Sequence, residues 1–266
     1  MTYQVVLSGC GLAVWVWFLS PRLRGRHALP EEPVLPVPWG GVDLLLAAFF
    51  FLALMSGARL LMGWMANVEA DQPIPYPLQV AGAAVTNGLT VCLMIALAVR
   101  FGRRGVTGLG LRSESPAEEV LMGILGFFAV MPALMLFNFI LVNVAPVLNY
   151  EIRSQQVVTM FRRDRGSAVV AWLALYAVIG APVTEEVIFR GFAQGYLRKR
   201  FSALPAILLS SLVFACFHAP VHVTIAIFLL GLILGYLRER TQSLVAPVVA
   251  HVLFNLNTFL TTQIAP

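Results

Sequence analysis

Three short segments in the second half of the chain combine acidic, basic, imidazole and amide side chains with apolar neighbours. They are EEVIFR at residues 185–190, FACFH at residues 214–218 and HVLFN at residues 251–255. A carboxylate beside a histidine can take a proton from water. A histidine and an asparagine that donate hydrogen bonds to one point can stabilise an oxyanion. Together these residue types predict hydrolysis of an amide bond by activated water, without a covalent nucleophile.

The spacing within EEVIFR separates the two glutamates. Glu186 and Arg190 are four residues apart, so on a helix they share a face and can form an ion pair. Glu185 points about 100° away, because a helix has ~3.6 residues per turn, and it is free to face another helix. Gly180 and Pro182, one turn earlier, predict close helix approach and a kink. The alternative for the charged pair is a purely structural lock between two helices.

The other two segments show the same spacing of four residues. Phe214 and His218 share one helix face, and His251 and Asn255 share another. A buried histidine on its own is more often structural than catalytic. A His–Asn pair is also a common hydrogen-bonding link between membrane helices. The functional interpretation therefore depends on the three segments coming together.

Composition indicates the environment in which they would meet. The chain of 266 residues is 59% hydrophobic and 12% charged, whereas soluble domains are about a quarter charged. Each apolar block is close to the ~20 residues that cross a bilayer as a helix, and backbone polar groups in lipid must be paired. The blocks span residues 3–19, 42–66, 78–99, 118–143, 167–189, 204–217, 221–237 and 244–262. We expect an all-α, polytopic membrane helix bundle of about eight transmembrane helices, a single integral membrane domain over 1–266 whose motif-bearing helices lie within 167–262.

The distribution of positive charge predicts the orientation. The net charge is +5, and the arginines lie in short loops between apolar blocks. This pattern is typical of positive-inside topology, so we expect membrane lipids as partners and no nucleic acid. Arg22, Arg24 and Arg26 follow the first block, which is therefore interpreted as a retained helix with its N-terminus outside. Residues 145–166 would carry four arginines outside, and we interpret them as an interfacial segment. The expected location is a bacterial inner (plasma) membrane.

Depth in the bilayer connects the three segments. At 1.5 Å per residue, Glu185 lies about 20 Å from the basic edge at Arg198, and His218 is at about the same depth in the next helix. His251 and Asn255 lie about 12 and 18 Å from the same side. If the three helices are neighbours, these side chains surround one pocket of water inside the membrane.

The segments match the motifs EExxxR, FxxxH and HxxxN in this order, and so resemble the CPBP family of intramembrane endopeptidases. This family, also called Abi, contains CAAX prenyl proteases and bacteriocin-processing enzymes. The resemblance covers about residues 180–256, whereas the first four blocks match only in hydropathy. It implies a bundle of about eight helices with a water-filled conical cavity, and a membrane-associated protein or peptide substrate, with or without a lipid.

The resemblance also implies roles for individual residues. Glu185 and His218 would activate water, and His251 and Asn255 would form the oxyanion site. The residues implied to support the site are Glu186, Arg190 and Phe214.

Three alternatives stay open. A zinc-dependent protease would use Glu185, His218 and His251 as ligands, although HExxH is absent and we expect no cofactor. A non-enzymatic membrane immunity or scaffold protein would use the same helices for binding. A proton-coupled transporter would use the buried glutamates and histidines as a relay. This sequence, however, does not show the repeated broken helices that are expected of many transporters.

Overall fold

The computed structural model describes residues 2–18, 29, 37–68, 72, 74–152, 159, 168–218 and 221–264, and these contain helices but no β-strand. Most of the predicted interfacial segment, residues 153–158 and 160–166, lies outside this described part. The helical elements are α1 (Thr2–Phe18), α2 (Gly41–Ala66), α3 (Tyr76–Val99), α4 (Arg103–Gly108), α5 (Pro116–Val144), α7 (Ala168–Leu175), η2 (Tyr176–Gly180), α8 (Ala181–Glu186), η3 (Val187–Gln194), α9 (Gly195–Leu197), α10 (Ala203–Cys216), α11 (Val221–Thr241) and α12 (Val245–Ile264).

Eight apolar helical segments correspond to the eight predicted blocks. Six are long and apolar enough to cross a membrane: α2, α3, α5, the continuous segment 170–197, α11 and α12. The other two, within α1 and α10, are shorter. The prediction of an all-α, multi-pass membrane bundle is therefore confirmed.

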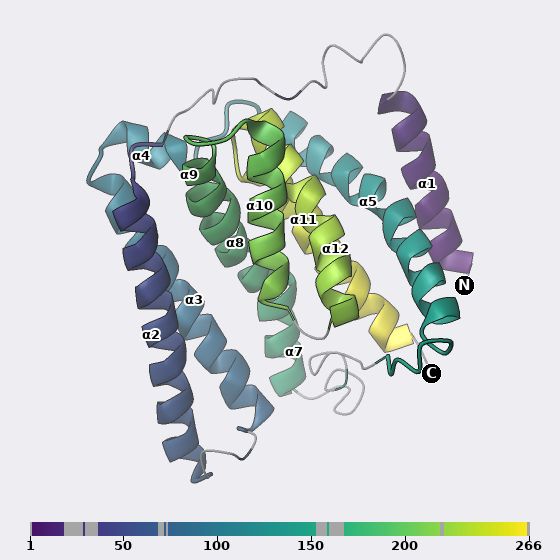
Figure 1. Cartoon of the computed structure of the whole chain (residues 1–266), viewed down its shortest axis with the longest axis horizontal. Coiled ribbons are helices and arrows are strands. Elements are labelled where there is room, and N and C mark those ends of the chain that lie inside the picture. The colour runs from purple at the N-terminus through teal and green to yellow at the C-terminus, as the bar shows by residue number, and fades with distance from the viewer. Residues whose placement is uncertain are drawn as a thin grey trace.

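The motif-bearing helices lie in the middle of the bundle (Figure 1). There α2 and α3 form a pair at one side, α1 packs on α5 at the other, and α7 to α12 stand between them. Small residues permit the closest contacts. A Cβ added to Gly123 of α5 would lie 2.6 Å from the carbonyl oxygen of Ala246 in α12, and one added to Gly231 of α11 would lie 2.9 Å from Cβ of Ser211 in α10. The first contact places α12, which carries HVLFN, beside α5, and the second places α11 beside α10.

Two buried clusters hold the motif helices in place. One contains Phe214 of α10 together with Leu230, Leu234 and Ala250 of α11 and α12, all fully buried. In the other, the indole of Trp39 stacks on Phe192 of η3, with ring centroids 4.8 Å apart. The indole nitrogen also donates to the carbonyl oxygen of Phe192 at 3.1 Å.

Candidate active site

The helix that carries EEVIFR contains two π-helical stretches, η2 and η3, on either side of α8. At the end of η2, the backbone N–H of Ala181 donates to the carbonyl of Tyr176, five residues earlier. In the same pattern the carbonyl of Ala177 would accept from residue 182, but Pro182 has no N–H. The side chain of Asn255 supplies the missing donor, with Nδ2 2.8 Å from the Ala177 oxygen. Single π turns of this kind are frequent at functional sites.

Glu186 is the centre of a fully buried charged group. Its Oε2 lies 3.3 Å from Nε of Arg190, and its Oε1 lies 2.9 Å from Nδ1 of His251 in α12. Within the described residues, Nη1 and Nη2 of Arg190 have no hydrogen-bond partner. The guanidinium instead lies over the ring of Phe214, 4.7 Å from its centroid, which is a cation–π geometry. The predicted pairing of Glu186 with Arg190 is confirmed.

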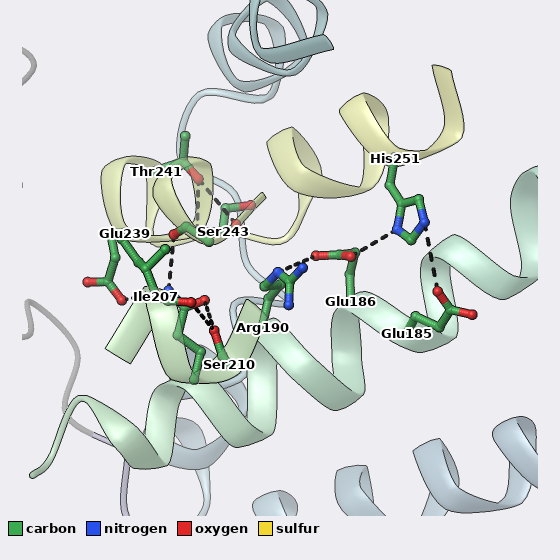
Figure 2. A network of polar contacts seen from close by, with 11 residues as sticks. Glu185, Glu186, Arg190, Ile207, Ser210, Glu239, Thr241, Ser243 and His251 are labelled. Atoms are coloured by element: carbon green, nitrogen blue, oxygen red, sulfur yellow. Dashed lines mark hydrogen bonds and ion pairs between the residues drawn. The ribbon is translucent and has the colours of Figure 1, made fainter. Parts of the chain in front are cut away.

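Glu185 faces the other nitrogen of the same imidazole. Its Oε2 is 3.8 Å from Nε2 of His251, and its side chain is 20% exposed, unlike Glu186 at 0%. Figure 2 shows His251 between the two glutamates, one at each ring nitrogen. Because a neutral imidazole has one N–H, a neutral His251 that donates to Glu186 has no proton on the nitrogen that faces Glu185.

His218 follows the end of α10 and is half-buried. Its Nδ1 lies 3.0 Å from the carbonyl oxygen of Phe214. A carbonyl only accepts, so this bond places the proton of a neutral ring on Nδ1 and leaves Nε2 as an acceptor. The ring of Phe214 contacts both histidines edge-on, with centroids 4.9 Å from His218 and 5.7 Å from His251. Phe214 therefore contacts both predicted histidines, and Glu185 faces one of them, His251.

Asn255 does not lie where a member of the expected oxyanion site would lie. Its amide donates to Ala177, whereas both nitrogens of His251 face carboxylates. In this structure, His251 and Asn255 therefore do not donate to a common point.

A second buried polar network lies further along the same helix, and sequence reasoning missed it. Glu239 of α11 accepts from Nε of Arg198 at 2.9 Å and from Nε2 of Gln194 at 2.9 Å. Ser210 of α10 donates to Oε1 of Gln194 at 3.2 Å. Arg198, taken above as a basic edge, is only 5% exposed. The signal was present in the sequence, because residues 186, 190, 194 and 198 are all polar and four apart, which makes one helix stripe.

A cavity of about 430 Å³ lies between α1, α5, α11 and α12. Its polar lining residues are Ser8, Asn138, His222, Asn257 and Thr258. None of the seven predicted site residues lines it. The water-filled pocket expected around Glu185 is therefore not this cavity.

The donor set considered for zinc does not fit a bound ion. Both nitrogens of His251 are directed at carboxylates, and Nδ1 of His218 at a carbonyl. In the described ranges, no group of three or more His, Cys, Asp or Glu side chains could hold a metal ion.

Comparisons with known proteins agree with the motifs. The family model for type II CAAX prenyl endopeptidase Rce1-like proteins matches residues 167–257. A bacterial protein named "Putative membrane peptidase YdiL", from Bacillus subtilis (strain 168), is 25% identical over 164 residues, which are 62% of this chain and 65% of that protein. The chain thus matches slightly less than two thirds of the relative's length. No solved structure matches significantly. The family match and the three motifs together support the CPBP family for residues 167–257, which are similar to CAAX-protease-like proteins.

Proposed function

We propose that this chain is an intramembrane endopeptidase that hydrolyses a peptide bond in a membrane-associated protein or peptide, with Glu185 and His218 activating the water. The observation that supports this most strongly is that Glu185 faces His251 and that the ring of His251 contacts Phe214, which contacts His218 as well. The exposure of Glu185 matters as well, because a general base must reach water. A buried structural carboxylate, such as Glu186, has no such access.

The proposed reaction follows from the positions of the protons. A water molecule held between Glu185 and Nε2 of His218 loses a proton to Glu185 while its oxygen attacks the carbonyl carbon. The resulting oxyanion is stabilised by hydrogen-bond donation, for which we assign the Nε2–H of His251 as an imidazolium, whose other N–H donates to Glu186. Glu185 then gives the proton to the leaving nitrogen, and the C–N bond breaks. The products are a carboxylic acid and an amine, so the enzyme returns to its starting protonation.

Glu186 and Arg190 have a supporting role in this scheme. Arg190 compensates the charge of Glu186, and Glu186 accepts at Nδ1 of His251. This hydrogen bond fixes the orientation of the imidazole, in the way that a carboxylate orients the histidine of other hydrolases. Asn255 would join the oxyanion site only if its amide left Ala177 when substrate binds.

The family match supports a substrate of the CAAX type, in which cleavage occurs near a lipidated cysteine at a membrane surface. The test uses purified full-length chain in liposomes with paired peptides, identical except for an S-farnesyl group on cysteine, and mass spectrometry of the products. We expect endoproteolysis by the parent and none by His218→Ala. Equal cleavage by both proteins would refute the assignment of His218. Absence of any cleavage, together with saturable peptide binding, would favour the non-enzymatic alternative.

A further inference from the structure

The cavity of about 430 Å³ between α1, α5, α11 and α12 has the size of a ligand site. Such sites typically measure about 300–1,000 Å³, whereas voids in protein interiors rarely exceed the size of a water molecule. The cavity lies toward the ends of α5 and α12 and the start of α11, which share one end of the bundle (Figure 1). Two of its lining residues, Met135 and Asn138 of α5, are exposed. The cavity therefore opens at the surface of the bundle beside α5.

Three of the polar side chains in this cavity offer hydrogen-bond acceptors. Within the described residues, the buried Oδ1 of Asn257 has no hydrogen-bond partner. Oγ of Ser8 donates its proton to Sδ of Met135 at 2.9 Å, and Oγ1 of Thr258 donates its own to the carbonyl of Phe254 at 3.0 Å. Both hydroxyls therefore have only lone pairs left for a ligand. A buried acceptor without a partner costs free energy, and a ligand that carries N–H or O–H groups would remove this cost.

The cavity shares its walls with the candidate active site. Phe254 lies three residues after His251 in HVLFN and lines the cavity. On α11 the lining begins at His222, four residues after His218, and the carbonyl of His218 accepts a hydrogen bond from Thr224. The segments that carry the two predicted catalytic histidines therefore continue into the wall of the cavity.

A peptide that is cleaved inside a membrane needs partners of this kind. Its chain must be extended where water attacks, so the N–H and C=O groups there lose their helical hydrogen bonds, and unpaired backbone groups are costly in lipid. The acceptors in the cavity can bind such N–H groups, whereas a lipid acyl chain has no donor for Asn257. Along α12, Thr258 lies about 10 Å beyond His251, which three extended residues span at ~3.3 Å each.

We propose that this cavity binds an extended segment of the peptide substrate, about three residues from the bond that is cleaved, and that Oδ1 of Asn257 accepts one of its backbone N–H groups. This inference rests on the proposed function, which makes a peptide the substrate. Asn257 is then a binding residue, so its loss should raise KM and leave kcat unchanged. A structural asparagine would affect Tm instead, but Oδ1 of Asn257 has no partner among the described residues.

The first test removes the acceptor and follows KM. The substrate is the peptide of the liposome assay that the parent cleaves. Asn257→Leu, of similar size, is expected to raise KM about 10-fold, with kcat and Tm at parental values, and Thr258→Val should raise KM by a smaller factor. Two control variants make the same chemical changes outside the cavity lining. Asn143→Leu in α5 and Thr261→Val in α12 should leave KM unchanged.

Modified substrates test the hydrogen bond itself. Peptides that are N-methylated at one peptide bond each, on either side of the cleavage site, remove the substrate N–H groups one at a time. One of these methylations should raise the KM of the parent about 10-fold and leave that of Asn257→Leu within twofold, because both changes remove the same bond. The proposal is overturned if Asn257→Leu keeps the parental KM within twofold. It is also overturned if every methylation has the same effect in both proteins.

Binding measured without cleavage separates this inference from the proposed function. With a labelled peptide in which a ketomethylene group replaces the scissile amide, the Kd should rise about 10-fold from the parent to Asn257→Leu. If Glu185→Gln cleaves like the parent, the proposed function fails, and this Kd still decides the inference. Native mass spectrometry tests a lipid as the occupant. A phospholipid that the parent retains and Asn257→Leu releases, at an unchanged Kd for the peptide, would overturn the proposal.

Discussion

The side-chain amide of Asn255 donates to the backbone carbonyl of Ala177, 2.8 Å away and 78 residues earlier in the chain. Pro182 lacks the N–H that the π-helical pattern would direct at this carbonyl. The bond therefore connects α12 to the helix of Glu185 at the point where that helix is irregular. It gives Asn255 the structural role of an interhelical hydrogen bond, which was the alternative to a catalytic role for HVLFN.

A rescue experiment tests this structural function. Asn255→Ala leaves the Ala177 carbonyl unpaired, which should cost about 1–3 kcal/mol of unfolding free energy. Pro182→Ala supplies a backbone N–H at position 182, so the double variant should recover much of this loss. Thermal unfolding of the parent, both single variants and the double variant in one detergent gives the comparison. An unchanged Tm in Asn255→Ala, together with a loss of kcat above 100-fold, would instead support the oxyanion role.

Loss of Arg190 should destabilise the protein strongly. Arg190→Ala leaves the carboxylate of Glu186 buried without its cation, and breaking a buried pair typically costs about 3–5 kcal/mol. Removing both charges in Glu186→Gln/Arg190→Met should be less harmful than removing the arginine alone. Denaturation in detergent measures both, with the exposed Arg103→Ala as control. A fully stable Arg190→Ala variant would contradict the pairing.

The network around Glu239 should serve folding and not catalysis. Glu239→Gln removes the carboxylate that is paired with the buried Arg198, so we expect a loss of about 3 kcal/mol or more in unfolding free energy. The kcat per folded molecule should stay within twofold of the parent, because the network lies about three turns from Glu185 along the helix. The measurement pairs Tm with activity normalised to monodisperse protein. A large fall in normalised kcat at unchanged Tm would show that the network belongs to the site.

Removal of metal ions should not affect activity. The described donors form no ligand group, and the proposed reaction uses a carboxylate to activate water. We expect cleavage rates to be unchanged after dialysis against a strong chelator followed by elemental analysis of the protein. Activity that disappears on chelation and returns with a stoichiometric amount of Zn²⁺ would support the zinc alternative.

Local spacing was sufficient to predict part of this site. Hydropathy located all eight helical segments, because an apolar segment in lipid must pair its own backbone N–H and C=O groups and therefore forms a helix. The Glu186–Arg190 pair needed only the helical repeat. Both features depend on neighbouring residues, and the structure confirms both.

Contacts between distant segments were not predictable in this way. The bridging of Glu185 and Glu186 by His251 requires α12 to pack beside α8, which no local pattern shows. The π turn depends on Pro182 and on a donor from Asn255 together. Arg198 was taken for a loop charge because its partner Glu239 lies 41 residues away. The sequence also gave no reason to connect Asn87 with Tyr176.

The most direct test of the central claim is the cleavage rate of Glu185→Gln in liposomes, compared with the parent and with Glu118→Gln. Glu118 is exposed at the start of α5, so its substitution makes the same chemical change away from the site. We predict equal rates for the parent and Glu118→Gln, and a rate at least about 1,000-fold lower for Glu185→Gln at the same Tm, as expected when a water-activating base is lost. Cleavage by Glu185→Gln within threefold of the parent would contradict the account.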